Sequence, residues 1–308
     1  MRSLFRFLVI SFSISVFASF NSITLAEVKG SISSYSWFNR GEFIIEGNDQ
    51  QAHNNWYINQ PTDSIMLGAN TYFFEVKYNE RISADFTLNS GLIKDEQQVT
   101  YMVHNQQGYL KDLSYSSVEG RSSFGSCGLF YRLMGKTNKS ISRFDIGVGY
   151  IGYKSSVTYN NTSVVIDWDN PLNNNRTFSE DWEKYNIYYH GIDFRIKEEV
   201  FVTQGISVSL SGGYASRLTA KYTSVKYPER PVAQQQKNII SANGNGIHYD
   251  IRLNYYFTPN FSVNGGYKYL LLRTEGHNHT DVYPMRNGSD QKLKSEMGGF
   301  IFSVAYHF

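Results

Sequence analysis

An alternation of apolar and polar residues, repeated along most of the chain, is the feature that most constrains the fold. In "RISADFTLNSGLI" every second residue from Ile82 to Phe86 is apolar, and polar residues such as Asp85 stand between them. Successive side chains of a β-strand point to opposite faces, so this period predicts strands with one apolar face and one polar face. The same period recurs in "RFDIGVGYIGY", "GISVSLSGGY" and "NGIHYDIRLNYYF".

The polar face of these strands carries charges in mid-strand. They are Asp85, Arg132, Asp145, Asp193, Arg195, Asp250, Arg252 and Lys268. A soluble sandwich also alternates, but with its polar face in solvent and its apolar face in a core. Charges that pair across a polar lumen, with lipid on the apolar face, fit a membrane barrel better.

The spacing of the strands gives a second pattern. Short connections at 78–81, 135–140, 198–205 and 257–260 alternate with long polar ones at about 48–62, 94–122, 159–184, 223–243 and 275–294. The sequence therefore predicts an all-β fold, a transmembrane antiparallel β-barrel of about ten strands with short periplasmic turns and long extracellular loops. The expected strand starts are residues 31, 64, 81, 123, 143, 185, 206, 246, 261 and 295. A lumen of this size should be nearly filled by side chains.

The two ends of the chain indicate export to the outer membrane. Residues 1–26 combine Arg2 and Arg6, an apolar run and small residues before Glu27, which is typical of a cleaved signal peptide ending near Ala26. The alternative is an uncleaved anchor helix. The barrel domain is then 27–308. It ends on "GGFIFSVAYHF", which reads as a last strand with a terminal Phe that the barrel assembly machinery recognises.

Composition excludes several classes of function. The chain has 29 Lys and Arg against 27 Asp and Glu, and removal of Arg2 and Arg6 leaves 27 of each. A net charge of zero gives no electrostatic case for nucleic acid. The single Cys127 cannot form an internal disulfide, and by parity it faces lipid. We expect a monomer without a cofactor.

The order of these elements resembles the omptins, the ten-stranded outer-membrane proteases of Gram-negative bacteria. The resemblance rests on "SIMLGANTYFFEVKYNERISADFTLNSG", on the turn in "YYFTPNFSVNGGYKY" and on the Asn-rich last loop. It implies an Asp pair in the second outer loop and an Asp-His pair in the fourth. Here "GYLKDLSYSS" supplies only Asp112, and "RLTAKYTSVKYPERP" has neither His nor Asp. Omptin-type proteolysis is therefore not expected.

Other polar residues of the outer loops are candidates for chemistry. Asp112 could act with an acid from another loop, Asp167, Asp169 or Asp181. Asp167 and Asp169 could also bind Ca²⁺, although the twelve-residue calcium-loop pattern is absent, and the simpler interpretation is solvated loop carboxylates. In "TEGHNHTDVYP", His277, His279 and Asp281 alternate and could ligate a transition metal.

Cations near the outer loops suggest lipid partners. Arg217, Lys221 and Arg273 could meet lipopolysaccharide phosphates at the outer leaflet. The sequence thus predicts a non-enzymatic surface protein, for adhesion to a host or other extracellular ligand or for envelope structure. The alternatives are a diverged omptin-like endopeptidase and a narrow pore lined by Asp85, Arg132, Asp145, Arg195, Asp250 and Arg252.

Overall fold

The computed structural model describes residues 28–49, 54–61, 64–75, 81–105, 110–135, 141–167, 175–178, 183–226, 236–279 and 290–308. The predicted signal peptide lies outside these residues. The described residues form twelve β-strands: β1 (Val28–Asp49), β2 (Asn54–Pro61), β3 (Ser64–Glu75), β4 (Ile82–Asn105), β5 (Leu110–Met134), β6 (Ser142–Asp167), β7 (Arg176–Phe178), β8 (Glu183–Thr203), β9 (Ile206–Lys226), β10 (Gln236–Thr258), β11 (Phe261–Asn278) and β12 (Asp290–His307). In the part of the chain that is described, no helix is long and apolar enough to cross a membrane.

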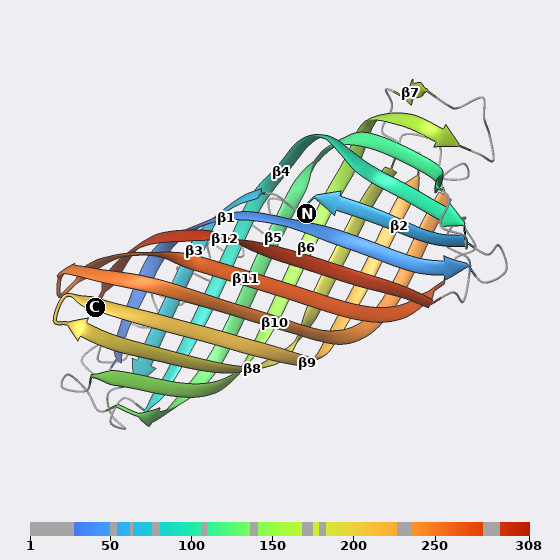
Figure 1. The fold of residues 1–308 in the computed structure, drawn as a ribbon. Helices are drawn as coiled ribbons and strands as arrows, with labels where there is room; N and C mark the ends of the chain where they lie inside the picture. Colours follow the sequence, from blue (N-terminus) through green and yellow to red (C-terminus); the bar gives the residue numbers. More distant parts are fainter. Residues whose placement is uncertain are drawn as a thin grey trace, which may run out of the picture.

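The strands pair antiparallel into one barrel (Figure 1). β1 pairs with β12 from Ser31 opposite His307 to Gly47 opposite Gln291, so the first and last long strands meet. β2 and β3 both lie between β1 and β4 and share one position, and the short β7 pairs only with β6. Twelve strands therefore occupy ten positions around the barrel, as the sequence predicts.

The alternation places apolar side chains on the outside of the barrel. On β12 and the residue after it, Phe300, Phe302, Val304, Tyr306 and Phe308 are 39–72% exposed, whereas the intervening Ile301, Ser303 and Ala305 are buried. Cys127 is exposed on the outer face, as parity predicts. The mid-strand charges lie on the inner face, where Arg132, Asp145, Asp193, Arg195, Asp250 and Lys268 are all buried.

The strands are longer than the sequence predicts at one end. Starts at the short-turn end agree within a few residues: 28, 82, 142, 206 and 261 against the predicted 31, 81, 143, 206 and 261. At the opposite end β5, β10 and β12 begin at 110, 236 and 290, before the predicted 123, 246 and 295. Most of the connection predicted at 94–122 is strand, because the β4–β5 hairpin continues to Asn105 and resumes at Leu110.

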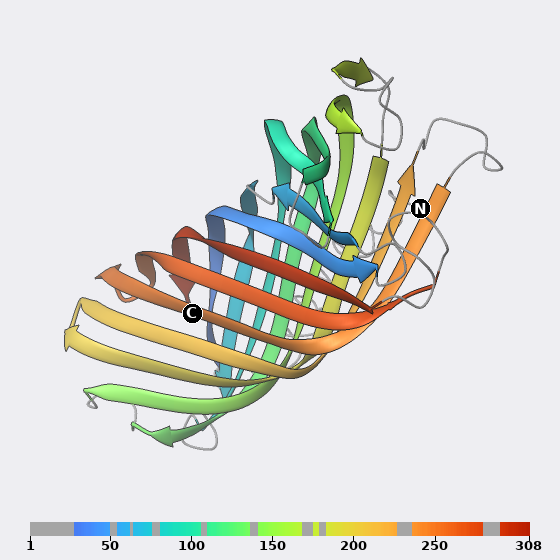
Figure 2. The ribbon, with the colours of Figure 1, turned by 45° about the vertical axis from the view of Figure 1, so that its right-hand side comes forward.

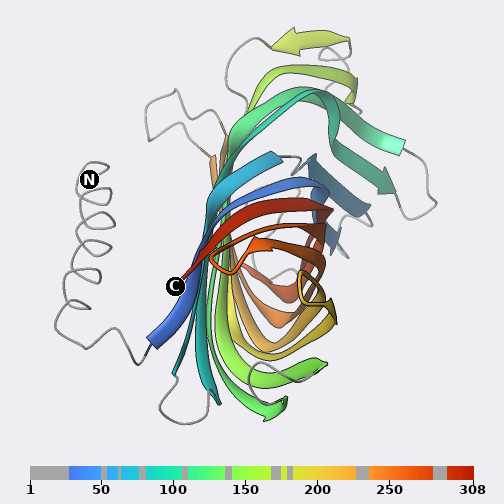
Figure 3. The same cartoon turned by 90° about the vertical axis from the view of Figure 1, so that its left-hand side faces the viewer.

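The barrel wall is uneven in height at this long-hairpin end. β5 and β6 have 25 and 26 residues, whereas β11 and β12 have 18 each. Figures 2 and 3 show β4, β5 and β6 rising beyond the ends of β11 and β12. One side of the barrel therefore carries a tall extension of paired strands.

Candidate functional site: the filled lumen and the outer rim

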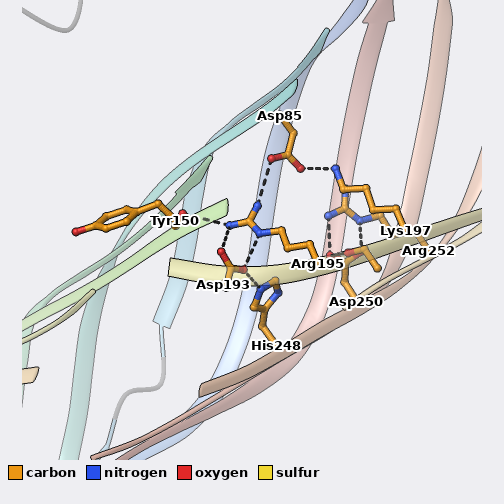
Figure 4. A network of polar contacts seen from close by, with 9 residues as sticks. Asp85, Tyr150, Asp193, Arg195, Lys197, His248, Asp250 and Arg252 are labelled. Carbon is orange, nitrogen blue, oxygen red and sulfur yellow. Dashed lines mark hydrogen bonds and ion pairs between the residues drawn. The ribbon is translucent and has the colours of Figure 1, made fainter. Parts of the chain in front are cut away.

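A polar layer fills the lumen toward the short-turn end (Figure 4). It consists of Asp85, Asp193, Arg195, Lys197, His248, Asp250 and Arg252. At its centre the guanidinium of Arg195 donates from Nε to Asp193 Oδ2 at 2.6 Å and from one terminal nitrogen to Asp193 Oδ1 at 3.1 Å. Two parallel charge-assisted bonds fix both position and plane of the two groups.

Other strands are tied into the same layer. Arg195 also donates to Asp85 on β4 at 3.2 Å, and Lys197 pairs with the second oxygen of Asp85. His248 on β10 lies with Nε2 2.7 Å from Asp193 Oδ2. The layer thus connects β4, β8 and β10 across the lumen.

Asp250 and Arg252 form a second centre of the layer. Arg252 donates to both oxygens of Asp250, at 2.9 and 3.2 Å, and Ser211 donates to Asp250 at 2.9 Å. Toward the short-turn end follow the pair of Arg132 with Asp145 at 3.1 Å and a group around Glu199, which accepts from Ser207 and Tyr256. All six residues of the predicted pore lining face the lumen, but each is held in an ion pair.

Glycines on neighbouring strands make room for this layer. A Cβ on Gly149 would lie 2.5 Å from Arg195 Nε, and one on Gly213 would lie 2.2 Å from His248 Nε2. A Cβ on Gly128 would lie 3.1 Å from both Arg195 and Asp85. Because real Cβ atoms essentially never come within 3.0 Å of another heavy atom, the present positions of Arg195 and His248 depend on glycine at 149 and 213, whereas the fit of Arg195 against Gly128 is only tight.

An aromatic layer closes the lumen toward the long-hairpin end. It consists of Trp37, Phe43, Phe124, Tyr153, Tyr159, Tyr185, Tyr189 and Tyr222, each at most 2% exposed. Phe43 on β1 stacks on Tyr185 of β8 with ring centres 5.9 Å apart. β1 and β8 are five positions apart in either direction around the ten-position barrel, so this contact joins opposite walls.

A second contact crosses the full width of the lumen. Lys268 on β11 lies with Nζ 3.8 Å from the ring centre of Phe124 on β5, and these strands are also five positions apart. Ammonium groups over aromatic faces are attracted by the ring quadrupole. An aromatic stack and a cation–π contact therefore each span the lumen, which agrees with the prediction that side chains nearly fill it.

The structure describes two of the four candidate catalytic acids, Asp112 and Asp167. Asp112 and Asp167 are register partners on β5 and β6, so their backbones lie opposite each other at the top of the tall extension. Asp169 and Asp181 lie outside the described residues. Within the described ranges, the β9 and β10 segments of the fourth outer hairpin bring no His or Asp to the rim.

The metal candidates do not assemble into a site. His277 and His279 are both exposed, and Asp281 is outside the described residues. His277 instead pairs with Asp290 of β12, with Nδ1 2.8 Å from Oδ1. Among the residues that the structure places, no group of three or more His, Cys, Asp or Glu side chains could hold a metal ion.

The candidate rim cations share one outer wall. Arg217 and Lys221 on β9 and Arg273 on β11 are exposed on the outside of the barrel. Ser216 is an extra residue on β9 relative to β8, since Ile192 faces Arg217 and Asp193 faces Ala215. This bulge turns both Ser216 and Arg217 outward, above the exposed ring of Tyr214.

Sequence reasoning located the lumen charges but not their partners. It placed Asp193 and Arg195 on the polar face without identifying His248 as their neighbour from β10. The sequence did contain one indication of these contacts. Glycines stand at lumen-facing positions of β5, β6 and β9, and such glycines mark where a neighbouring side chain needs space. Contacts such as Phe43 with Tyr185 depend on which strands stand opposite each other in the barrel. The sequence of a single strand does not determine this.

Comparison with known proteins was informative only at the level of structure. No family model matches the sequence, and no curated protein matches it significantly. The outer membrane protease OmpT from Escherichia coli matches with a TM-score of 0.66 over 92% of this chain and 98% of that chain, at 12% identity. This chain has the fold of an outer-membrane β-barrel, omptin-like in layout. The predicted architectural resemblance is confirmed.

Two further solved structures match less well. Ail of Yersinia pestis gives a TM-score of 0.30 at 11% identity, over 92% of this chain and 99% of that chain. OprG from Pseudomonas aeruginosa gives 0.33 at 9% identity, over 92% and 96%. These scores are too low to carry an argument. By the omptin-like layout, the short-turn end is the periplasmic end and the long hairpins are extracellular.

Proposed function

We propose that this outer-membrane barrel works through its outer surface, as a non-enzymatic protein whose extracellular hairpins bind another surface or an extracellular ligand. The observation that carries the proposal is the contact of Phe43 with Tyr185 across the full width of the lumen. A lumen closed in this way favours neither a steady pore nor a substrate channel. The tall β4–β6 extension offers the largest surface beyond the apolar band.

The register of the β4–β5 hairpin allows a clean test. Asp95 and Val118 face each other in the pairing, so residues 96–117 can be replaced by an Asn-Gly turn that rejoins the two strands. Cells expressing this variant should adhere less to epithelial monolayers than cells expressing the intact protein at equal surface level. If cells with the intact protein and cells with the variant both adhere no better than cells without the protein, the adhesion role is refuted.

We further propose that Arg217, Lys221 and Arg273 bind lipopolysaccharide phosphates. Arg217 and Arg273 are separated by one strand, on which Asn245 faces Arg273, and so stand about 10 Å apart on the wall. The exposed rings of Tyr214 and Tyr249 lie nearer the short-turn end on β9 and β10, so the cations stand beyond these rings, which suits the border between lipid chains and head groups.

Charge neutralisation tests this proposal. Substituting Gln at Arg217, Lys221 and Arg273 should lower the amount of lipopolysaccharide that copurifies with the barrel, and the difference from wild type should shrink as salt rises, because salt screens the wild-type contacts. Arg81→Gln is a matched control, because Arg81 is exposed at the periplasmic end, where it donates to Tyr131 at 3.0 Å. If the triple variant and the control retain equal amounts of lipopolysaccharide, these three cations do not bind it and the proposal fails.

A diverged omptin-like endopeptidase is the second candidate, favoured by one observation. The register places the backbone of Asp112 directly opposite that of Asp167, and a pair of acids is one way to activate water. Cells should then cleave a dibasic fluorogenic peptide, and Asp112→Ala should abolish cleavage. We expect instead no cleavage above that of cells without the protein, since the omptin Asp-His pair has no counterpart in the fourth hairpin.

A further inference from the structure

Three buried residues that carry hydrogen-bond donors lie near one another between the polar and the aromatic layers of the lumen. Lys268 projects from β11, and Tyr35 and Trp37 project from β1. Lys268 Nζ lies 5.0 Å from the ring centre of Trp37 and 5.6 Å from that of Tyr35. All three residues are at most 5% exposed, so the ammonium group stands well inside the barrel.

The charges around this point do not balance. The middle of the lumen contains three carboxylates, Asp85, Asp193 and Asp250, and four cations, Arg195, Lys197, Arg252 and Lys268. Each carboxylate already has an ion-pair partner: Asp85 and Asp193 pair with Arg195, and Asp250 pairs with Arg252. Within the described part of the chain, no carboxylate lies at ion-pair distance from Lys268 Nζ. Asp250 faces Lys268 in the β10–β11 register, but it is already bonded to Arg252 and Ser211, so one buried positive charge remains in excess, which is costly.

The hydrogen-bonding groups beside Lys268 are also unpaired. Trp37 Nε1 and Tyr35 Oη are buried and have no hydrogen-bond partner among the described residues. An indole N–H and an ammonium can only donate. A water molecule would accept from these donors but would need acceptors for its own hydrogens, whereas an anion needs only donors.

We propose that this point is a binding site for a small inorganic anion of the halide class, such as chloride. Lys268 would supply the neutralising charge, and the Trp37 N–H and the Tyr35 O–H would supply directed hydrogen bonds. The ring of Phe124, 3.8 Å from the ammonium, would hold Lys268 in place. The anion would fix β1 to β11 across the width of β12 and stabilise the closed lumen.

Refolding in defined salts tests the site directly. The mature barrel is refolded with sodium chloride, sodium bromide or sodium gluconate at equal ionic strength. Melting temperature should be higher in either halide than in gluconate, with saturation as halide concentration rises. Crystals grown in bromide should show an anomalous peak beside Lys268 Nζ. Absence of both effects in the wild-type protein would overturn the proposal without recourse to any variant.

Two variants separate a built site from an adventitious ion. Lys268→Met keeps the length of the side chain and removes its charge, and Trp37→Phe keeps a ring and removes the N–H. The halide midpoint should weaken about tenfold in Trp37→Phe, because a hydrogen bond to a charged group is lost, and the halide effect should vanish in Lys268→Met. Lys294→Met on the outer wall is the control and should respond as wild type. Equal halide response in all four proteins would mean an adventitious ion only and would refute the site.

Discussion

Gly149 on β6 offers the sharpest test of how the polar layer is built. A Cβ added here would lie 2.5 Å from Arg195 Nε and 2.6 Å from both Arg195 Cζ and the backbone oxygen of Cys127. Both the guanidinium and the β5 backbone at Cys127 lie too close, so both must shift, and the guanidinium at the end of a long side chain shifts further. Gly149→Ala therefore changes one methyl group and displaces the central cation of the lumen.

The expected cost follows from what Arg195 holds. Its displacement would break both bonds to Asp193, whose side chain is fully buried, and the bond to Asp85 at 3.2 Å. Breaking a buried ion pair on one side costs about 3–5 kcal/mol, because the remaining charge is left without a partner. His248 still faces Asp193, so we expect the lower end, about 3 kcal/mol of unfolding free energy.

Urea unfolding of the barrel in detergent, followed by tryptophan fluorescence, measures this loss. Gly152→Ala on the same strand is the matched control, since its Cβ would meet only the Tyr189 backbone oxygen at 3.9 Å. A double-mutant cycle with Arg195→Met isolates the clash with the guanidinium from that with the Cys127 backbone. If Gly149→Ala and Gly152→Ala cost the same, the glycine does not make room for Arg195 and the argument fails.

Three further predictions concern the lumen and the lipid face. Phe43→Ala should cost about 3–5 kcal/mol of unfolding free energy, as for other buried Phe residues, whereas Phe38→Ala on the lipid-facing side should cost much less. The wild-type barrel should show no steady conductance in planar bilayers. A channel of constant conductance would contradict the filled lumen. A fluorophore on the exposed Cys127 should be quenched by lipid chains carrying a nitroxide, and resistance to such quenching would place β5 in the wrong register.

The alternation of apolar and polar residues was enough to predict which side of the barrel wall each strand residue faces, because this depends only on the residues next to it in the strand. The five lipid-facing residues from Phe300 to Phe308 and the inward Asp193 and Arg195 are placed as the alternation predicts. The outer ends of the strands were not predictable in the same way. Beyond the lipid both faces can be polar, so the polar run "KDEQQ" at 94–98 has the composition of a loop although β4 continues through it to Asn105.

The candidate site depended on information of another kind. Whether Phe43 meets Tyr185 is decided by strand number and stagger, which set which walls stand opposite, and not by the composition of either strand. A ten-position barrel puts β1 opposite β8 and β11 opposite β5, and large residues on these strands close the lumen with one stack and one cation–π contact. Small residues at positions 43 and 124 would remove both contacts that span the lumen. Whether opposite walls of this barrel touch across the lumen therefore depends on a few inward side chains.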